Sequence, residues 1–589
     1  MRCATRPSAR PARHALHALL ALPLALAIAC TAPDASDDGV PEWATTTYAP
    51  QNRPDVRGTT GAVSSDHPLA SEAGLAVLRD GGTATDAIIA MAGVLAVTRP
   101  HMNGIGGDAF GIFYDGATGE VTALNASGRS GALATPEFFR NAGLDAVPDT
   151  GALSVSVPGA VAGWVDAHER FGTKPFAELL EPAIRYARDG FPVSTRLAQD
   201  FAEQGDRLNG PGRNLYLPDD APPAVGSLLR NPALATSLEV VATRGKAGFY
   251  EGEIARALAG YVEVRGGHLR ASDFAAHTSM WVDPLRGRYL DHTFLVMPPS
   301  TQGPAQLALM EMSRAYDLQE MGHNSADYLH TMIELKKLAF ADRDRWIADP
   351  EKAEVPISRL LHPDYLSGRA SLVDPSRAAE DMRPGFGEDL DTEADSAASP
   401  NDAGDTVYLT AVDQWGNAVS WIQSNFAGFG SGLVEPTTGI LLHNRGALYT
   451  LQEGHPNQVA PEKHPYHTLT PMMALDQEGR FAFTLGTPGG DSQPQSILQI
   501  VHNLLLFDMT PQVAVEAARF RSLGGLRVSL ENRVSLEAVR GLASRGHDIR
   551  MIEGWTATFG GAQMIIYDPE TGVLTAAADP RREAYALAY

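Results

Sequence analysis

The sequence predicts a soluble α+β protein or a layered sandwich, and three observations support this fold class. Of the 589 residues, 44% are hydrophobic and 20% are charged, which is typical of a soluble globular protein with a large core. Segments with strand periodicity and segments with helix periodicity follow one another in mixed order. The length is sufficient for about two to four domains, and no internal repeat is evident.

Helical segments dominate the first half of the chain. Small and apolar residues at helical spacing predict two packed helices within 67–97. After a glycine-rich break, two strands that pair with each other are expected at 109–114 and 121–124. Residues 160–260 are predicted to be largely helical, and the apolar spacing over 325–345 predicts an amphipathic helix.

A segment of different composition separates the two halves. Residues 374–404 contain many acids and few large apolar side chains, so they cannot bury enough surface to offset their ordering entropy. We expect a flexible surface loop or linker there. Beyond it, the period-2 pattern of 406–412 predicts a half-buried strand, and a second strand is expected at 418–423. The remaining predicted elements are two helices and two strands, at 493–506, 511–519, 563–567 and 573–577.

The N-terminus has the three parts of an export signal. Several arginines precede an apolar stretch at 15–29 that is too short to span a bilayer, and small residues precede Cys30. A cysteine at this place resembles a bacterial lipoprotein signal, in which Cys30 is lipidated. The alternative is an ordinary secretory signal with an incidental cysteine. We expect a signal peptide at 1–29, a tether at 30–57, and a protein exported to the periplasm or cell envelope with a lipid anchor.

Charge and cysteine content exclude several classes of function. The net charge of −23 argues against nucleic acid or an anionic membrane surface as a partner. The only cysteines, Cys3 and Cys30, lie in or beside the signal, so the exported body has no disulfide and no thiol nucleophile. The sequence contains no P-loop, no G-x-S-x-G elbow, no H-E-x-x-H motif and no evident cluster of histidines and carboxylates. No metal site and no cofactor are therefore predicted.

Of the routes to nucleophilic catalysis, a hydroxyl nucleophile with an unusual base is the one that remains, and Thr406 is the candidate. It opens a predicted strand directly after the acidic segment. If the peptide bond before Thr406 breaks, its new α-amine, with an unperturbed pKa of about 7.7–8.0, can accept the proton of its own hydroxyl. By itself this is weak evidence, because a threonine that opens a strand is usually structural.

Two further segments contain candidate site residues. Gly489 and Gly490 precede a predicted helix, where consecutive backbone N–H groups can stabilise an oxyanion. The alternative is a plain strand-to-helix turn that uses glycine for its dihedral angles. The polar cluster "KHPYHTLTP" at 463–471 either lines a pocket or forms a surface loop.

Several segments in the same order resemble the γ-glutamyltranspeptidase family. They are "NGIGGDAFGIFY", "PPSTQG" and "ELKKLAFADRDRW" in the first half, and "GDTVYLTAVDQWGNAVSW", "HTLTP" and "GTPGGD" in the second. The resemblance implies a four-layer αββα sandwich of the N-terminal nucleophile hydrolase type, built from two subunits of one precursor. It implies a large-subunit part at 58–373, an acidic segment at 374–405 that cleavage removes from the site, and a small-subunit part at 406–589.

The resemblance also assigns the catalytic roles. Thr406 corresponds to the nucleophile that cleaves the precursor, and Ser424 to a hydroxyl residue that hydrogen-bonds this nucleophile. Gly489 and Gly490 correspond to the oxyanion-hole glycines. The reaction that this implies forms an acyl-enzyme on Thr406 from a small-molecule amide, and water or an amine then resolves it.

The positions that bind a glutamyl group in the family differ here. The arginine that holds the α-carboxylate falls at Ser127, with Arg129 two residues later. Two serines are replaced by His467 and Thr468, and the acid that binds the α-amine falls at Leu448. A charged α-amine needs an anionic partner when buried, so the loss of this acid argues against tight recognition of an α-amine.

Arg129, Arg445 and His467 can instead meet a substrate carboxylate without any amine. Arg445 takes a second polar position near Leu448, and Asn425 stands beside Phe426, which aligns with an asparagine of the family. This pattern resembles the acylase-like branch, which includes cephalosporin (glutaryl) acylases. The predicted substrate-binding residues are Arg129, Asn425, Arg445, His467 and Thr468, with the alternative that each is a solvated surface residue.

The leading hypothesis is an exported, autoprocessed amidohydrolase that acts on γ-glutamyl-like or glutaryl-like amides. Hydrolysis is expected to be favoured over transpeptidation. The first alternative is a true γ-glutamyltransferase acting on glutathione. The second, from a different class, is a catalytically inactive, lipid-anchored binding protein that keeps the fold.

Overall fold

The computed structural model describes residues 53–387 and 404–589. The predictions of a signal peptide at 1–29, of lipidation at Cys30 and of most of the tether lie outside these residues. The described part mixes helices with antiparallel sheets, as the composition and the mixed order of the elements predicted. No helix within it has the length and apolar character needed to cross a membrane.

One seven-stranded antiparallel sheet contains Thr406. Its strands, in spatial order, are β21 (Tyr585–Ala588), β2 (Ala62–Ser65), β10 (Gly404–Val412), β11 (Ala418–Ala427), β3 (Asp108–Tyr114), β4 (Val121–Ala126) and β7 (Met280–Val282). The predicted strand pairs at 109–124 and 406–423 are thus confirmed. The two pairs are adjacent in the sheet, because β11 also pairs with β3.

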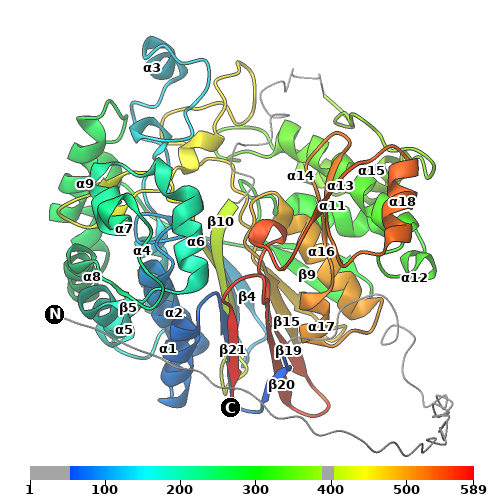
Figure 1. Ribbon diagram of the computed structural model, residues 1–589, viewed down its shortest axis with the longest axis horizontal. Helices are drawn as coiled ribbons and strands as arrows, with labels where there is room; N and C mark the ends of the chain where they lie inside the picture. The colour runs from blue at the N-terminus through cyan, green and yellow to red at the C-terminus, as the bar shows by residue number, and fades with distance from the viewer. Residues whose placement is uncertain (1–52, 388–403) are drawn as a thin grey trace, which may run out of the picture. The chain divides into compact units, whose positions relative to one another are not determined.

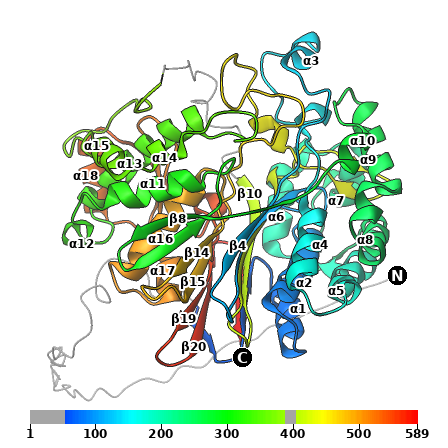
Figure 2. The ribbon, with the colours of Figure 1, turned by 180° about the vertical axis from the view of Figure 1, so that it is seen from behind.

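A second seven-stranded antiparallel sheet lies beside the first. Its strands, in spatial order, are β1 (Val56–Gly58), β20 (Val573–Ala578), β19 (Gln563–Asp568), β15 (Phe481–Gly486), β14 (Met472–Leu475), β9 (His292–Val296) and β8 (Leu285–Tyr289). Buried side chains from both sheets, among them Tyr408, Ile422, Met473 and Ile565, form one hydrophobic cluster. Figures 1 and 2 show the two sheets next to each other in the middle of this part of the chain.

Helices cover the side of each sheet that faces away from the other sheet (Figures 1 and 2). Beside the first sheet lie α1 (Pro68–Arg79), α2 (Ala84–Thr98), α4 (Ala160–Phe171), α5 (Phe176–Asp189) and α8 (Pro232–Tyr250). Beside the second lie α11 (Gly303–Ser313), α13 (Ala326–Trp346), α15 (Pro363–Ala370), α16 (Ser492–Leu505), α17 (Pro511–Glu516) and α18 (Leu536–Ser544).

The other elements are short or peripheral. The helices are α3 (Pro136–Asn141), α6 (Thr195–Gln204), α7 (Gly210–Tyr216), α9 (Glu253–Glu263), α10 (Ala271–Ala275), α12 (Leu318–Met321) and α14 (Ile357–Leu360). The strands are β5 (Phe191–Pro192), β6 (Leu228–Leu229), β12 (Val434–Glu435), β13 (Ile440–Leu441), β16 (Phe520–Ser522), β17 (Arg527–Glu531) and β18 (Asp548–Ile552).

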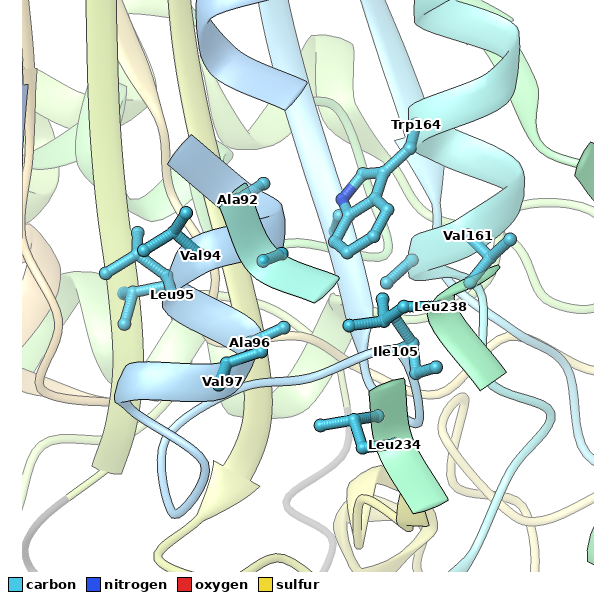
Figure 3. Packing of buried hydrophobic residues seen from close by; sticks show 14 of the residues in the cluster. Ala92, Val94, Leu95, Ala96, Val97, Ile105, Val161, Trp164, Leu234 and Leu238 are labelled. Atoms are coloured by element: carbon cyan, nitrogen blue, oxygen red, sulfur yellow. The ribbon is translucent and has the colours of Figure 1, made fainter. Parts of the chain in front are cut away.

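The two predicted helices within 67–97 are α1 and α2, and α2 is the central helix of the larger core. Thr83 and Asp86 form a capping box at its start, which satisfies free N–H groups of the first turn. Every residue of α2 is buried. Its apolar side chains pack near Trp164 of α4 and Leu238 of α8 (Figure 3). A helix that is apolar on all faces is expected in such a position.

Two burial predictions were wrong for the same physical reason. The strand at 406–412 is not half-buried, since Val407 and Leu409 face the helical core while Tyr408 faces the core between the sheets. The helix at 325–345 is not amphipathic, because α13 is buried on nearly all sides, including His330 and Glu334. Both elements have neighbours on opposite faces, which a local pattern does not reveal.

The first part of the acidic segment is attached to the folded chain. The N–H of Ala378 donates to the carbonyl of Arg545 at 2.8 Å, and Lys337 of α13 donates to the carbonyl of Ala379 at 2.7 Å. The ring of Phe386 stacks on Trp346 with centroids 4.9 Å apart. Residues 374–387 therefore differ from the predicted flexible loop. Residues 388–403 lie outside the described part.

Candidate active site

Thr406 is buried near the start of β10, where its hydroxyl contacts Ser424 of the neighbouring strand β11. Thr406 Oγ1 lies 3.0 Å from Ser424 Oγ. Ser424 Oγ donates to the carbonyl oxygen of Asp405 at 3.0 Å and accepts the N–H of Phe426 at 2.8 Å. Because the single proton of Ser424 is used on Asp405, Thr406 is the donor of the shared hydrogen bond. Ser424 thus joins the Thr406 hydroxyl to the carbonyl of the preceding peptide bond.

The backbone departs from regular strand geometry at this point. Asp405 is paired with Phe426 and Thr406 with Ser424, so Asn425 has no partner in the ladder. Phe426 has a φ of +74°, in the left-handed region that costs a non-glycine residue about 1–3 kcal/mol. β-Bulges often lie beside active sites, where they redirect side chains. The irregularity is located opposite the Asp405–Thr406 peptide bond.

The side chain of Asp405 is also held in place. Its Oδ1 lies 3.3 Å from Nη2 of Arg582, and both side chains are buried. Burial lowers the pKa of Arg582, but the charges of Asp405, and then of the buried Asp66 and Asp200, raise it above its usual value. The peptide bond before Thr406 is therefore fixed through its carbonyl by Ser424 and through the Asp405 carboxylate by Arg582.

Gly489 and Gly490 form the turn between β15 and α16. Their φ values are +124° and +55°, conformations that favour glycine. The carbonyl of Gly489 accepts the N–H of Ser492 at 3.0 Å, whereas the N–H groups of both glycines have no acceptor among the described residues. Two free N–H groups in a buried turn can bind an oxyanion.

Contacts between the two sheets bring this turn toward Thr406. Thr410 of β10 lies 2.6 Å from Thr484 of β15 through their hydroxyl oxygens, and the ring of Tyr408 occupies the space beside Gly486 where a side chain would lie. The two strands thus pass each other in opposite directions. β10 runs back from Thr410 to Thr406 in the direction in which β15 runs from Thr484 to its end at Gly486, so Thr406 and the glycine turn lie toward the same end of the two sheets.

Gln302 joins its own segment to three others that carried the family resemblance, although sequence reasoning did not single it out. Its amide Nε2 donates to the carbonyls of Gly490, at 3.1 Å, and of Thr468. Its Oε1 accepts from Arg343 at 3.0 Å and from the hydroxyl of Tyr466 at 3.2 Å. The loop "PPSTQG", helix α13, the polar cluster at 463–471 and the glycine turn therefore meet at one side chain.

A buried ion pair lies on the other side of Ser424. Asp108, paired with Ser424 in the ladder between β3 and β11, accepts from Arg445 Nε at 2.9 Å and from Nη2 at 3.2 Å. Arg445 Nη1 donates to Thr468 Oγ1 at 3.3 Å, and the guanidinium lies 4.8 Å from the ring centre of Phe426. Burial alone would raise the pKa of Asp108, but the charge of Arg445 lowers it below its usual range.

Sequence reasoning missed Asp108. The available signal was an acid at the first position of an otherwise apolar strand, directly after the glycines of "NGIGGD". Gly107 in this motif leaves no room for a Cβ atom, because one would collide with the carbonyl of Ser424 and with Asn425 Oδ1. The motif thus allows β3 to begin in close contact with the strand that carries Ser424.

His467 lies beside this ion pair. It is fully buried, its Nδ1 is 3.8 Å from the Asp108 carboxylate, and its ring packs edge-on against Phe110 with centroids 4.8 Å apart. Burial lowers the pKa of His467 well below its usual range, and the charge of Arg445 lowers it further, so the imidazole is neutral. The segment 463–471 is mostly buried, which contradicts the alternative of a surface loop.

Arg129 and Asn425 have other surroundings. Arg129 donates to His464 at 2.9 Å and to Glu351 at 2.7 Å, in a partly exposed group that contacts neither Thr406 nor Arg445. Asn425 is buried, and its amide donates to the carbonyl of Pro100 at 3.2 Å. The structure thus brings together Thr406, Ser424, Arg445, His467 and Thr468, whereas Arg129 is paired elsewhere. The substrate-binding roles stay predictions.

Comparisons with known proteins agree with this geometry. A family model described as Gamma-glutamyltranspeptidase matches residues 70–589. The Glutathione hydrolase-like YwrD proenzyme of Bacillus subtilis is 34% identical over 542 residues, covering 90% of this chain and 99% of that protein. The Oxamate amidohydrolase proenzyme of Klebsiella pneumoniae is 35% identical over 548 residues, with the same shares covered. The crystal structure of cephalosporin acylase from Bacillus halodurans has a TM-score of 0.84 at 32% identity, and the match covers 92% of this chain and 98% of that one.

Proposed function

Because this chain belongs to the gamma-glutamyltranspeptidase family, we propose that it is an exported amidohydrolase that cleaves itself before Thr406 and then uses Thr406 as an N-terminal nucleophile. The hydrogen-bond path from Thr406 through Ser424 to the carbonyl of Asp405 carries this proposal. We further propose that the two adjacent sheets and their helices form the four-layer αββα sandwich of N-terminal nucleophile hydrolases, with two subunits after cleavage. The similarity to cephalosporin acylase supports this assignment.

The contacts suggest how self-cleavage proceeds. Thr406 Oγ1 attacks the carbonyl carbon of Asp405 and gives its proton to Ser424 Oγ, which transfers its own proton to the carbonyl oxygen. The C–N bond then breaks, the proton on the former carbonyl oxygen passes to the nitrogen of Thr406, and the Asp405 acyl group is left as an ester on Oγ1. Water hydrolyses the ester, which releases Asp405 as a carboxylate and leaves Thr406 with a free α-amine.

The same groups can then act on a substrate. The α-amine of Thr406 accepts the proton of Oγ1, and Oγ1 attacks the carbonyl of a bound amide. The free N–H groups of Gly489 and Gly490 stabilise the tetrahedral oxyanion. The amine leaves with the proton, and water hydrolyses the acyl-enzyme. We propose that water resolves the acyl-enzyme more often than a second amine does, so hydrolysis is favoured over acyl transfer.

The substrate that we propose has an acyl group with a carboxylate and no charged α-amine. Arg445 has two N–H groups beyond the three that bond Asp108 and Thr468. The Thr468 hydroxyl keeps its own proton, so both Arg445 and Thr468 can donate to a carboxylate beside Ser424. No acid occupies the position of Leu448, so a substrate ammonium group would lack an anionic partner there. The relatives named above as an oxamate amidohydrolase and a cephalosporin acylase support this class, while the relative named as glutathione hydrolase-like supports the γ-glutamyl alternative.

A comparison of two anilides tests the substrate class. We expect kcat/KM for glutaryl p-nitroanilide to exceed that for γ-glutamyl p-nitroanilide by at least about tenfold, because an unpaired buried ammonium costs more than about 1.4 kcal/mol. The variant Leu448→Asp should shift this ratio toward the γ-glutamyl substrate. A clear preference of the wild-type enzyme for the γ-glutamyl anilide would instead support a true γ-glutamyltransferase.

Ser424→Ala tests the proposed path to the Asp405 carbonyl. Removing one hydrogen bond to a developing oxyanion typically costs about 10²–10³ in rate, so we expect self-cleavage to slow by that factor. The time course is followed on denaturing gels. Ser420→Ala is the matched control, because Ser420 is also a buried serine of β11 but bonds the hydroxyl of Tyr408 at 2.8 Å. Equal cleavage rates in the two variants would contradict the role of Ser424.

A further inference from the structure

A cluster of histidine and carboxylate side chains lies outside the active site. It consists of His330 and Glu334 on α13 and His547, which lies between α18 and β18. All three are buried, and their ligating atoms lie within 4.8 Å of one another. Sequence reasoning missed the cluster because His547 is 217 residues away from His330.

The two imidazoles face each other through nitrogen atoms. His330 Nδ1 lies 2.8 Å from His547 Nε2, and His330 Nε2 donates to the carbonyl of Asp374 at 2.8 Å. The bond to Asp374 places the His330 proton on Nε2 and leaves the Nδ1 lone pair directed into the cluster. Metal-binding histidines commonly hold their second N–H on a backbone carbonyl in this way.

His547 can change its tautomer without losing a proton. In the hydrogen bond to His330 its proton is on Nε2, whereas its buried Nδ1 has no hydrogen-bond partner among the described residues. Transfer of the proton to Nδ1 gives a lone pair on Nε2. The two facing nitrogens are then both free to bind a cation.

Glu334 supplies an oxygen one helical turn from His330. Its Oε1 accepts from Lys337 Nζ at 2.7 Å, and its Oε2 accepts the N–H of Ala379 at 3.0 Å. Each carboxylate oxygen has a second lone pair, so these bonds leave acceptor capacity on both atoms. Residues at i and i+4 of a helix lie on the same face, which explains why Glu334 points to the same space as His330.

We propose that His330, Glu334 and His547 form a binding site for Zn²⁺, with water as the fourth ligand. Two imidazole nitrogens and one carboxylate oxygen are a donor set that suits Zn²⁺ in tetrahedral coordination. Bond lengths of about 2.0–2.1 Å place tetrahedral ligand atoms about 3.3 Å apart. The facing nitrogens therefore need to separate by about half an ångström and turn toward one ion, and the Glu334 oxygen needs to approach from within the present 4.8 Å.

The location of the site suggests its role. His330 and Glu334 precede the proposed cleavage point and His547 follows it, while Asp374 and Ala379 belong to the segment that leads to that point. A bound Zn²⁺ would therefore link the two chains of the mature enzyme and hold the segment after 373 in place. This role rests on the proposed cleavage, but binding of the metal does not.

The test uses tag-free protein that has been stripped with a chelator and titrated with Zn²⁺ by calorimetry. We expect one high-affinity equivalent in the wild type and an affinity at least about 100-fold weaker in His547→Ala. His362→Ala is the matched control, because His362 is exposed beside Asp364, and it should bind like the wild type. Equal affinity and stoichiometry in the wild type and His547→Ala would overturn the proposal.

Three further variants keep the test decisive. Glu334→Gln keeps the size of the side chain, and Zn²⁺ should raise the thermal unfolding midpoint of the wild type but not that of Glu334→Gln. Lys337→Met removes a cation that competes for Glu334, so it should bind Zn²⁺ more tightly than the wild type. The uncleaved Thr406→Ala chain should bind Zn²⁺ as well, which separates a failure of this site from a failure of the proposed cleavage.

Discussion

Thr406→Ala is expected to remain a single chain on a denaturing gel and to lose at least about 10⁴-fold of the amidase activity, since it has no hydroxyl to attack either Asp405 or a substrate. The wild type should give two fragments, the smaller of which begins with Thr406 in N-terminal sequencing. Gel analysis, sequencing and an anilide assay together measure this result.

Two matched variants distinguish chemistry from folding. Thr406→Ser keeps a hydroxyl and should still cleave itself, although more slowly. Thr410→Ala removes a buried threonine hydroxyl from the same face of β10, where it contacts Thr484 rather than Ser424, and should mature normally. If Thr406→Ala yielded the same two fragments as the wild type, the proposed nucleophile would be wrong.

Asp108→Ala is expected to lower the free energy of unfolding by about 3–5 kcal/mol, because it leaves the guanidinium of Arg445 buried without a counter-ion. This is a large share of the about 5–15 kcal/mol that stabilises a typical protein. The shift is measured as a change in the urea midpoint of the uncleaved Thr406→Ala chain, so that subunit dissociation does not contribute. An unchanged midpoint would contradict the structural role of the ion pair.

The double variant Asp108→Leu/Arg445→Met separates stability from binding. Replacing both partners of a buried ion pair by apolar residues is often neutral, so the urea midpoint should return close to that of the parent chain. Substrate binding should not return, because the donors of Arg445 beside Thr468 are lost. Recovery of both properties would argue against a role of Arg445 in the substrate site.

The pH dependence of this stabilisation follows from the pKa of Asp108, which is lower in the folded chain than in the unfolded chain. A group with a depressed folded pKa contributes its full stability above its unfolded pKa, about 3.9 for aspartate, and loses it as the pH falls through the folded value. The difference between the parent chain and Asp108→Ala should therefore be constant near neutral pH and shrink only in strong acid.

Local sequence patterns predicted the helices and strands that carry the site, but they did not predict how deeply these elements are buried. The spacing of apolar residues was sufficient to predict α1, α2 and α13, and the alternation after Thr406 was sufficient to predict β10 and β11. The same patterns did not indicate that β10 and α13 are buried on both sides. Burial depends on what packs against an element, and neither sheet order nor helix contacts are local properties.

By itself, the sequence determined the family, the mixed α/β architecture and the candidate nucleophile Thr406, because ordered motifs and short-range periodicity are written along the chain. Only the tertiary structure decided which residues surround that nucleophile. Asp108 lies beside Ser424 through strand register, Gln302 meets Gly490 between loops that follow two strands of the second sheet, and Arg129 is turned toward Glu351. The two members of each pair are at least 188 residues apart in the sequence, and the first pair also depends on a one-residue register, so only the packed chain brings them together.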